Sequence, residues 1–289
     1  MPMSKHTPKL SPDITMRDLA FPSRLQLKLI SASLLLAFAS SAMAQDAGAK
    51  PGTPPAASKP ADPTAAKPFN DVIKDAKEIK GFFNLYQKDD KVWIEIKPEQ
   101  LDKPFFFSVN IPTSVGERRL YASQMGASHL VMWKKIGNQV QLIAKNTDFT
   151  AAAGTPAAIA VSQAFSDSLL ASAAVASAPH PESKGILVDA SALLFNDIVG
   201  YSTALEYAYR IPYALDKANS SFGRVRSDDS MTGFAVNAHF ATPRIAALPL
   251  TPPPVPMPTP PTTTPDPRSM FIGFYYSFAA LPATPMAGR

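Results

Sequence analysis

The stretch HLVMWKKIGNQVQLIAK, residues 129–145, contains two apolar runs that are joined by the pair Gly137-Asn138. Both residues of this pair accept a positive φ, which a two-residue turn between antiparallel strands requires. It is the strongest local signal for secondary structure in the chain. We therefore predict a β-hairpin with strands over 129–136 and 139–145.

A strand-like pattern recurs on both sides of this hairpin. Residues 82–87 and 92–96 alternate with a period of two around the polar turn 88–91, which predicts another hairpin. The run at 105–111 is expected to be buried on both faces or capped by aromatic contacts. Further strands are predicted over 185–190, 221–226, 233–240 and 271–278. The fold class is predicted to be α+β and β-rich, with antiparallel hairpins and a few short helices.

The helices are predicted to be short. The first begins at an Asn70 cap and ends at Gly81, with its apolar residues on one face. Two more are expected over 158–165 and 203–209. Two segments fit either a helix or a strand: 169–176 and 193–197.

The first 44 residues have the pattern of a secretory signal peptide. Arg24 and Lys28 precede an apolar stretch over 29–39, which is shorter than the roughly 20 residues of a bilayer span. Small residues close this stretch, and we predict cleavage between Ala44 and Gln45. The protein is therefore expected in the periplasm or the medium, exported by the general secretory route, with no transmembrane anchor after cleavage.

Composition divides the chain into segments. Translation starts at Met1 or at Met16, of which the second gives a more typical signal. Residues 45–68 hold few large apolar side chains, which predicts disorder. If the strand at 271–278 pairs with a strand beyond Arg289, it leaves an apolar sheet edge open. The predicted segments are 1–44, signal peptide; 45–68, disordered tether; 69–248, β-rich accessory domain or domains; 249–268, Pro-rich linker; and 269–289, the C-terminal strand of a truncated domain.

Charge and cysteine content exclude several classes of protein. The formal charge is +5, but residues 1–44 hold five basic and two acidic residues, so only +2 remains on the rest. That charge is too small and too dispersed for a phosphate-binding footprint, so no nucleic-acid partner is predicted. Without cysteine the chain has no disulfide and no lipid-attachment site, and it depends on its core for stability.

The residues that carry chemistry are sparse. His129, His180 and His239 follow the signal, and none lies three or four residues from another, as a helical metal site requires. We interpret His129 and His239 as partly buried strand residues and His180 as part of a solvated loop. Convergence with Asp189 or Asp197 is conceivable, but nothing in the spacing indicates it. We predict no catalytic, cofactor-binding or metal-binding residue in this chain.

Other candidates have simpler explanations. The adjacent pairs Asp89-Asp90 and Asp228-Asp229 are interpreted as solvated turns, because neighbouring strand residues face opposite ways. The chain has no Gly-x-Ser-x-Gly elbow and no glycine-rich phosphate loop. Aromatic side chains suggest either carbohydrate stacking or sheet core, and core is the commoner role at alternating strand positions. They are Phe82, Phe83, Trp93, Phe105, Phe106, Phe107 and Trp133.

Several ordered motifs carry a family resemblance. They are KGFFNLY at 80–86, KVWIEI at 91–96, MWK at 132–134, AFSDSLLAS at 164–172, GILVD at 185–189 and FYYSF at 274–278, followed by Leu281-Pro282 and Pro285-Met286. In this order they resemble the N-terminal part of bacterial secreted zinc-dependent metalloproteases of the met-zincin type. Such proteases open with two domains of unknown function. The resemblance covers roughly residues 69–289.

The resemblance implies an accessory region and not a catalytic one. In that family a His-Glu-x-x-His helix and a further histidine hold the zinc, and this chain has no such segment. No catalytic residue is carried over, and zinc belongs to the parent family only. The first hypothesis is an accessory region that packs on a peptidase domain, in cis or in trans, and assists its folding or gates its cleft. The alternative is a free-standing periplasmic binding module for a peptide, a glycan or an envelope surface. A third hypothesis is a hydrolase that uses His129 or His239.

Overall fold

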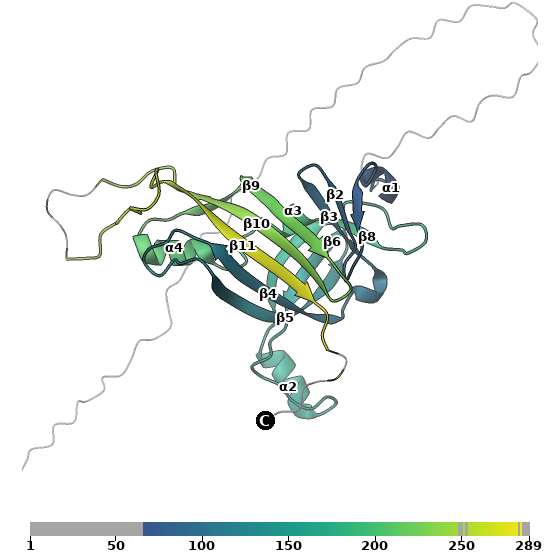
Figure 1. Ribbon diagram of the computed structural model, residues 1–289. Helices are drawn as coiled ribbons and strands as arrows, with labels where there is room; N and C mark the ends of the chain where they lie inside the picture. The colour runs from purple at the N-terminus through teal and green to yellow at the C-terminus, as the bar shows by residue number, and fades with distance from the viewer. Residues whose placement is uncertain (1–65, 248–250, 252–253, 283, 285–289) are drawn as a thin grey trace, which may run out of the picture. The chain divides into compact units, whose positions relative to one another are not determined.

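The structure, a computed structural model, describes residues 66–247, 251, 254–282 and 284 (Figure 1). The predicted signal peptide over 1–44, its cleavage site at Ala44 and Gln45, and nearly all of the tether over 45–68 lie outside the described residues. The described residues all fall within one compact unit.

The larger of two sheets has seven strands, and every neighbouring pair is antiparallel. Its order is β7-β6-β5-β4-β11-β10-β9. The strands are β4 (Pro104–Thr113), β5 (Gln124–Ile136), β6 (Gln139–Ala144), β7 (Ser168–Ala174), β9 (Ala214–Ser227), β10 (Met231–Ala241) and β11 (Ser269–Ala279). Figure 1 shows β11, the yellow strand, between β10 and β4.

The smaller sheet has four strands in the order β1-β2-β3-β8, also antiparallel. They are β1 (Lys77–Ile79), β2 (Leu85–Lys88), β3 (Lys91–Ile96) and β8 (Ile186–Asp189). The helical elements are α1 (Phe69–Val72), the 3₁₀ turn η1 (Pro98–Gln100), α2 (Pro156–Ala164), α3 (Ala190–Leu194) and α4 (Tyr201–Tyr209). Within the described ranges, no helix has the length and apolar character needed to cross a membrane. The β-rich, antiparallel fold with few short helices is thus confirmed.

Both hairpins form where turn chemistry predicts them. In the β5–β6 hairpin Ile136 pairs with Gln139, and Gly137 takes the positive φ of 56° that the turn requires. In the β2–β3 hairpin Lys88 pairs with Lys91. The two segments left open between helix and strand are also decided. Residues 168–174 pair with β6 as a strand, and α3 follows β8 directly.

The two sheets share one core of aromatic side chains. Phe278 of β11 is fully buried, and its ring centroid lies 5.1–6.1 Å from the rings of Phe83, Phe105, Phe107, Trp133 and Phe234. Phe83 lies between β1 and β2 of the small sheet, whereas the others belong to the large one, so this cluster joins the two layers. Burial of this size is the main source of stability in a chain without disulfides.

The structure excludes one of the two alternatives for the strand at 105–111, and the helix predicted from Asn70 is wrong in length. The strand expected over 105–111 is buried on one face only, because Phe105 and Phe107 are buried while Phe106 is 41% exposed. The helix expected to run from Asn70 to Gly81 is the four-residue α1 alone. Asp75 takes a left-handed φ of 63°, which ends the helical path, and β1 then pairs with β2.

The C-terminal strand differs from the expectation of a separate, truncated domain. β11 pairs with β10 along its whole length and with β4 on its other side. It is therefore an interior strand of the large sheet, and the open edge expected at 271–278 does not exist. The segment before it is also not a free linker, because Pro261 is buried and the hydroxyl of Tyr213 donates a hydrogen bond to the Pro267 carbonyl.

Candidate functional site

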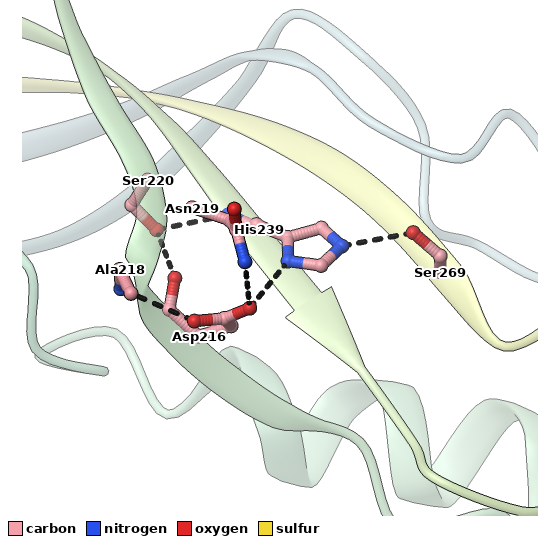
Figure 2. Close-up of polar contacts among 6 residues, drawn as sticks. All are labelled: Asp216, Ala218, Asn219, Ser220, His239 and Ser269. Carbon is pink, nitrogen blue, oxygen red and sulfur yellow. Dashed lines mark hydrogen bonds and ion pairs between the residues drawn. The ribbon is translucent and has the colours of Figure 1, made fainter.

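A chain of three polar side chains crosses three neighbouring strands of the large sheet (Figure 2). Asp216 of β9, His239 of β10 and Ser269 of β11 lie side by side. The Nδ1 atom of His239 is 3.1 Å from Oδ2 of Asp216, and its Nε2 atom is 2.8 Å from the Ser269 hydroxyl. Their atoms follow the order found in Ser-His-Asp hydrolases, in which histidine links a carboxylate to a nucleophile.

The carboxylate of this chain is strongly held. The Asn219 side chain donates to it at 2.6 Å and the Ala218 backbone N–H at 3.1 Å. Hydrogen bonds from Asn219 and from His239 lower the pKa of Asp216 below its ordinary value. The Ser220 hydroxyl donates to the Asp216 carbonyl at 2.8 Å and accepts the His239 N–H at 3.0 Å.

These bonds stabilise an irregularity in the sheet. Asn237 pairs with Ser221, whereas His239 pairs with Asp216, so residues 217–220 bulge out of the β9–β10 ladder. A bulge leaves backbone groups unpaired, and side chains commonly satisfy them. The network thus fastens the bulge to β10 and β11.

The same geometry does not favour acyl transfer. In serine hydrolases the backbone N–H of the nucleophile helps to hold the oxyanion. Here the Ser269 N–H donates to the Asp266 carbonyl at 3.2 Å. The imidazole also packs against Phe271 with ring centroids 4.9 Å apart. We therefore interpret the Asp216–His239–Ser269 chain as a structural network.

The structure does not gather the residues considered from sequence. His129 lies on β5, and the ring nitrogen Nδ1 of His180 accepts the backbone N–H groups of Glu182 and Ser183 in a turn. Asp189 accepts the Ser191 N–H at 2.8 Å and caps α3. Among the residues that the structure describes, no three His, Asp or Glu side chains lie close enough together to hold a metal ion.

Asp197, the second carboxylate considered as a histidine partner, is also a capping residue. It accepts the backbone N–H groups of Tyr201 and Ser202 at the start of α4. The acidic pair Asp228-Asp229 lies in the turn between β9 and β10, where Asp228 accepts the Ser230 N–H at 2.9 Å. Local hydrogen bonds thus account for these carboxylates.

Sequence reasoning did not identify Asp216 and Ser269 as partners of His239. They lie 23 and 30 residues away along the chain. Only strand register brings them together, and no motif spacing signals it. Sequence reasoning did identify the aromatic core, since Phe83, Phe105, Phe107 and Trp133 are all buried.

An apolar cavity of about 360 Å³ opens where β11 ends. Its apolar walls come from Phe82 and Phe83 between β1 and β2, Phe105 of β4, and Leu281 just after β11. Leu281 is 40% exposed at its mouth. The remaining lining residues are Glu99, Gln100, Lys103, Pro104 and Ala280. An apolar hollow of this size with a few polar groups at its edge can receive an apolar side chain.

The fold defines a protein of two antiparallel sheets around one shared core. The chain belongs to the family described as "Domain of unknown function (DUF5117)", whose model matches residues 123–289. A second model, "Domain of unknown function (DUF5118)", matches residues 66–113. Comparison with curated proteins and with solved structures found no match.

The two matched regions are not two independent domains in this structure. β4 lies in the first region, and it pairs with β5 and β11 of the second. The cavity beside Leu281 is likewise lined from both regions, by Phe105 and by Leu281. The two regions therefore form one sheet and one cavity.

Proposed function

We propose that this chain is a non-catalytic accessory region of an exported zinc-dependent metallopeptidase. It packs on the peptidase domain, in cis or in trans, and assists the folding of that domain or gates its cleft. The zinc belongs to the peptidase domain and not to this chain. Two adjacent regions of unknown function, the number that the resemblance implies, support this proposal.

The observation that carries the proposal is the apolar cavity at the end of β11. Phe82 and Leu281 present apolar surface to solvent there, and burying such surface is favourable by about 25 cal/mol per Å². The chain leaves the large sheet at the same place. A peptidase domain joined after Arg289 would therefore be tethered a few residues from the cavity, and an apolar side chain from it could enter the hollow.

The first test is to read the DNA beyond the codon for Arg289 and the adjacent reading frames. A His-Glu-x-x-His segment found there is expressed together with this chain, and the two are purified through a tag on the peptidase. We expect co-purification of this chain, or a peptidase that is folded only when this chain is present. The exported chain alone serves as the reference for stability and oligomeric state.

The variant Leu281→Glu places a charge at the mouth of the cavity and should weaken the association at least tenfold. The matched control is Ile136→Glu, which changes another exposed apolar residue, 51% exposed at the β5–β6 hairpin. Equal binding by the two variants would contradict the assignment of the cavity. If no such reading frame exists and the exported chain is a stable monomer, the free-standing binding module becomes the better explanation.

A further inference from the structure

Three arginines from two distant parts of the chain line one cavity of about 560 Å³. Arg118 and Arg119 lie in the turn after β4, and Arg210 follows α4. The other lining residues are Tyr207, Ala208, Pro256, Met257 and Thr259. In Figure 1, α4 and the segment that leads into β11 lie at the same end of the large sheet. The Thr259 N–H donates to the Tyr209 carbonyl at 2.8 Å, which joins them.

All three arginines have a left-handed backbone. Their φ angles are 51° for Arg118, 68° for Arg119 and 57° for Arg210. This conformation brings Cβ close to the following carbonyl oxygen, so residues other than Gly, Asn and Asp rarely adopt it. Residues held in such conformations cluster at ligand-binding and active sites.

In both places another residue would suit the backbone better. Glu117 and Leu120 bridge as an antiparallel pair around Arg118 and Arg119, a tight turn with positive φ at both central positions. Turns of that kind prefer Asn-Gly. Arg210 ends α4 with its N–H bonded to the Glu206 carbonyl at 2.7 Å, where Gly is preferred. The backbone does not need arginine, so what arginine adds at these positions is its guanidinium group.

Two of the three side chains, those of Arg118 and Arg210, are held in place without an ion pair. The guanidinium of Arg118 donates to the Ala208 carbonyl at 2.9 Å and lies 5.6 Å from the Tyr209 ring. That of Arg210 lies 5.0 Å from the Tyr207 ring. Within the described part of the chain, none of the three arginines has a carboxylate oxygen within 4 Å.

The carboxylate beside this cavity is already occupied. Glu117 accepts the Thr262 N–H at 2.9 Å, the Thr262 hydroxyl at 2.7 Å and the Tyr209 hydroxyl at 3.1 Å. These hydrogen bonds join the Glu117 carboxylate to Thr262 and Tyr209. Glu117 does not line the cavity. The cavity therefore keeps a surplus of positive charge, with an apolar wall formed by Pro256, Met257 and the Tyr207 ring.

We propose that this cavity binds an oxyanion, phosphate or carboxylate, carried by a ligand with an apolar portion. Guanidinium groups match both anions in geometry, since each offers parallel donors to two oxygens. The Tyr207 ring and Met257 would pack against the apolar portion. This binding site does not depend on the function proposed above.

The test is titration of the exported protein, by calorimetry at constant ionic strength, with inorganic phosphate, phenyl phosphate and citrate. We expect saturable binding of at least one of these anions. Phenyl phosphate should bind several-fold more tightly than phosphate, because its ring can pack on Tyr207. A preference for the phosphates indicates a phosphorylated ligand, and a preference for citrate indicates a ligand that carries carboxylates.

Two variants separate binding from structure. Arg119→Asn and Arg210→Gly should each lower the affinity at least tenfold and leave Tm unchanged or raise it by roughly 2–4 °C, since they relieve left-handed strain. Arg224→Gln removes the same charge from an exposed strand position and should change neither. The proposal is overturned if none of the anions saturates, or if Arg119→Asn binds them as well as the parent. It is also overturned if Arg224→Gln weakens binding equally, because the effect would then be net charge alone.

Discussion

Replacing Phe278 by alanine tests whether the last strand belongs to the core of this protein. Phe278 is fully buried, and its ring centroid lies 5.1–6.1 Å from five other aromatic rings, four from the large sheet and that of Phe83 between β1 and β2. Truncating a buried phenylalanine typically costs about 3–5 kcal/mol, and each aromatic pair adds about 0.5–1.5 kcal/mol that is not additive. With five neighbours, we expect the upper part of the first range, about 4–5 kcal/mol. A domain whose total stability is about 5–15 kcal/mol would lose much of it.

The measurement is the unfolding of the purified protein by urea and by heat. For a domain of this size, about 4 kcal/mol corresponds to a fall in Tm of roughly 8–16 °C. Phe278→Leu retains part of the apolar volume, so its Tm should lie between those of the unsubstituted protein and Phe278→Ala. This variant still tests the prediction if the alanine variant does not fold.

The matched control lies in the same strand. Phe271 is 53% exposed on the outer face of β11, so Phe271→Ala should cost less than about 1 kcal/mol. Equal losses at the two positions would refute the placement of β11 in the interior of the sheet. So would two separate unfolding transitions with only the smaller one affected by Phe278→Ala.

Three further substitutions test polar contacts. Glu95→Ala should cost about 2–3 kcal/mol in urea unfolding, because it leaves the Ser183 hydroxyl, a donor at 2.8 Å, without its buried acceptor. Gly185→Ala places a Cβ against the Glu95 carboxylate and should cost about 1–3 kcal/mol, but clearly less in the Glu95→Ala background; an equal cost in both backgrounds would contradict this packing. Burial alone would raise the pKa of Glu117, but hydrogen bonds from Thr262 and Tyr209 lower it below its ordinary value. The stability contributed by Glu117 is therefore present above the ordinary glutamate pKa of about 4.3 and is lost as pH falls through the lowered value. The protection factor of the Thr262 amide, its exchange rate relative to the intrinsic rate at each pH, should fall over that range, and Glu117→Gln should abolish this pH dependence.

Local chemistry made the hairpins predictable. The two-residue turn at Gly137-Asn138 takes a positive φ at Gly137, and its strands pair across it from Ile136 to Gln139. The position of β11 depends on pairing with β4, far earlier in the chain, which no local pattern determines. A signal was nevertheless present. Residues 271–278 are apolar at most positions, which is typical of a strand covered on both faces.

The Pro-rich segment was harder to interpret. Composition predicts a Pro-rich linker there, but it cannot show that Thr262 bonds to Glu117 or that Pro261 is buried. A Pro-rich composition is interpreted as a spacer because proline does not continue a helix or a strand. Docking depends on the surface that the segment meets, and that surface forms only when the sheet has folded.

The candidate sites were the least predictable features, for two physical reasons. His239 meets Asp216 and Ser269 through strand register alone, so no spacing along the chain reveals the network. At Arg118 and Arg119 the residue type does not predict the observed backbone, because a turn with positive φ at both central positions prefers Asn and Gly. Positions where local preference and observed backbone disagree are expected to be strained or functional, and this conflict is the reason to test the arginine cavity first.

The two proposed surfaces should act independently, because they lie at opposite ends of β11. The arginine cavity borders the segment that leads into Ser269, whereas the apolar cavity lies beside Leu281 after the strand ends. Eleven residues of strand span about 36 Å, well beyond the distance at which substitutions usually couple. Leu281→Glu should therefore leave the affinity for phosphate unchanged, and Arg119→Asn should leave the association with a peptidase domain unchanged. If either variant weakened both functions by similar factors, the shared cause would be a general loss of folding, and neither surface could be assigned from binding data alone.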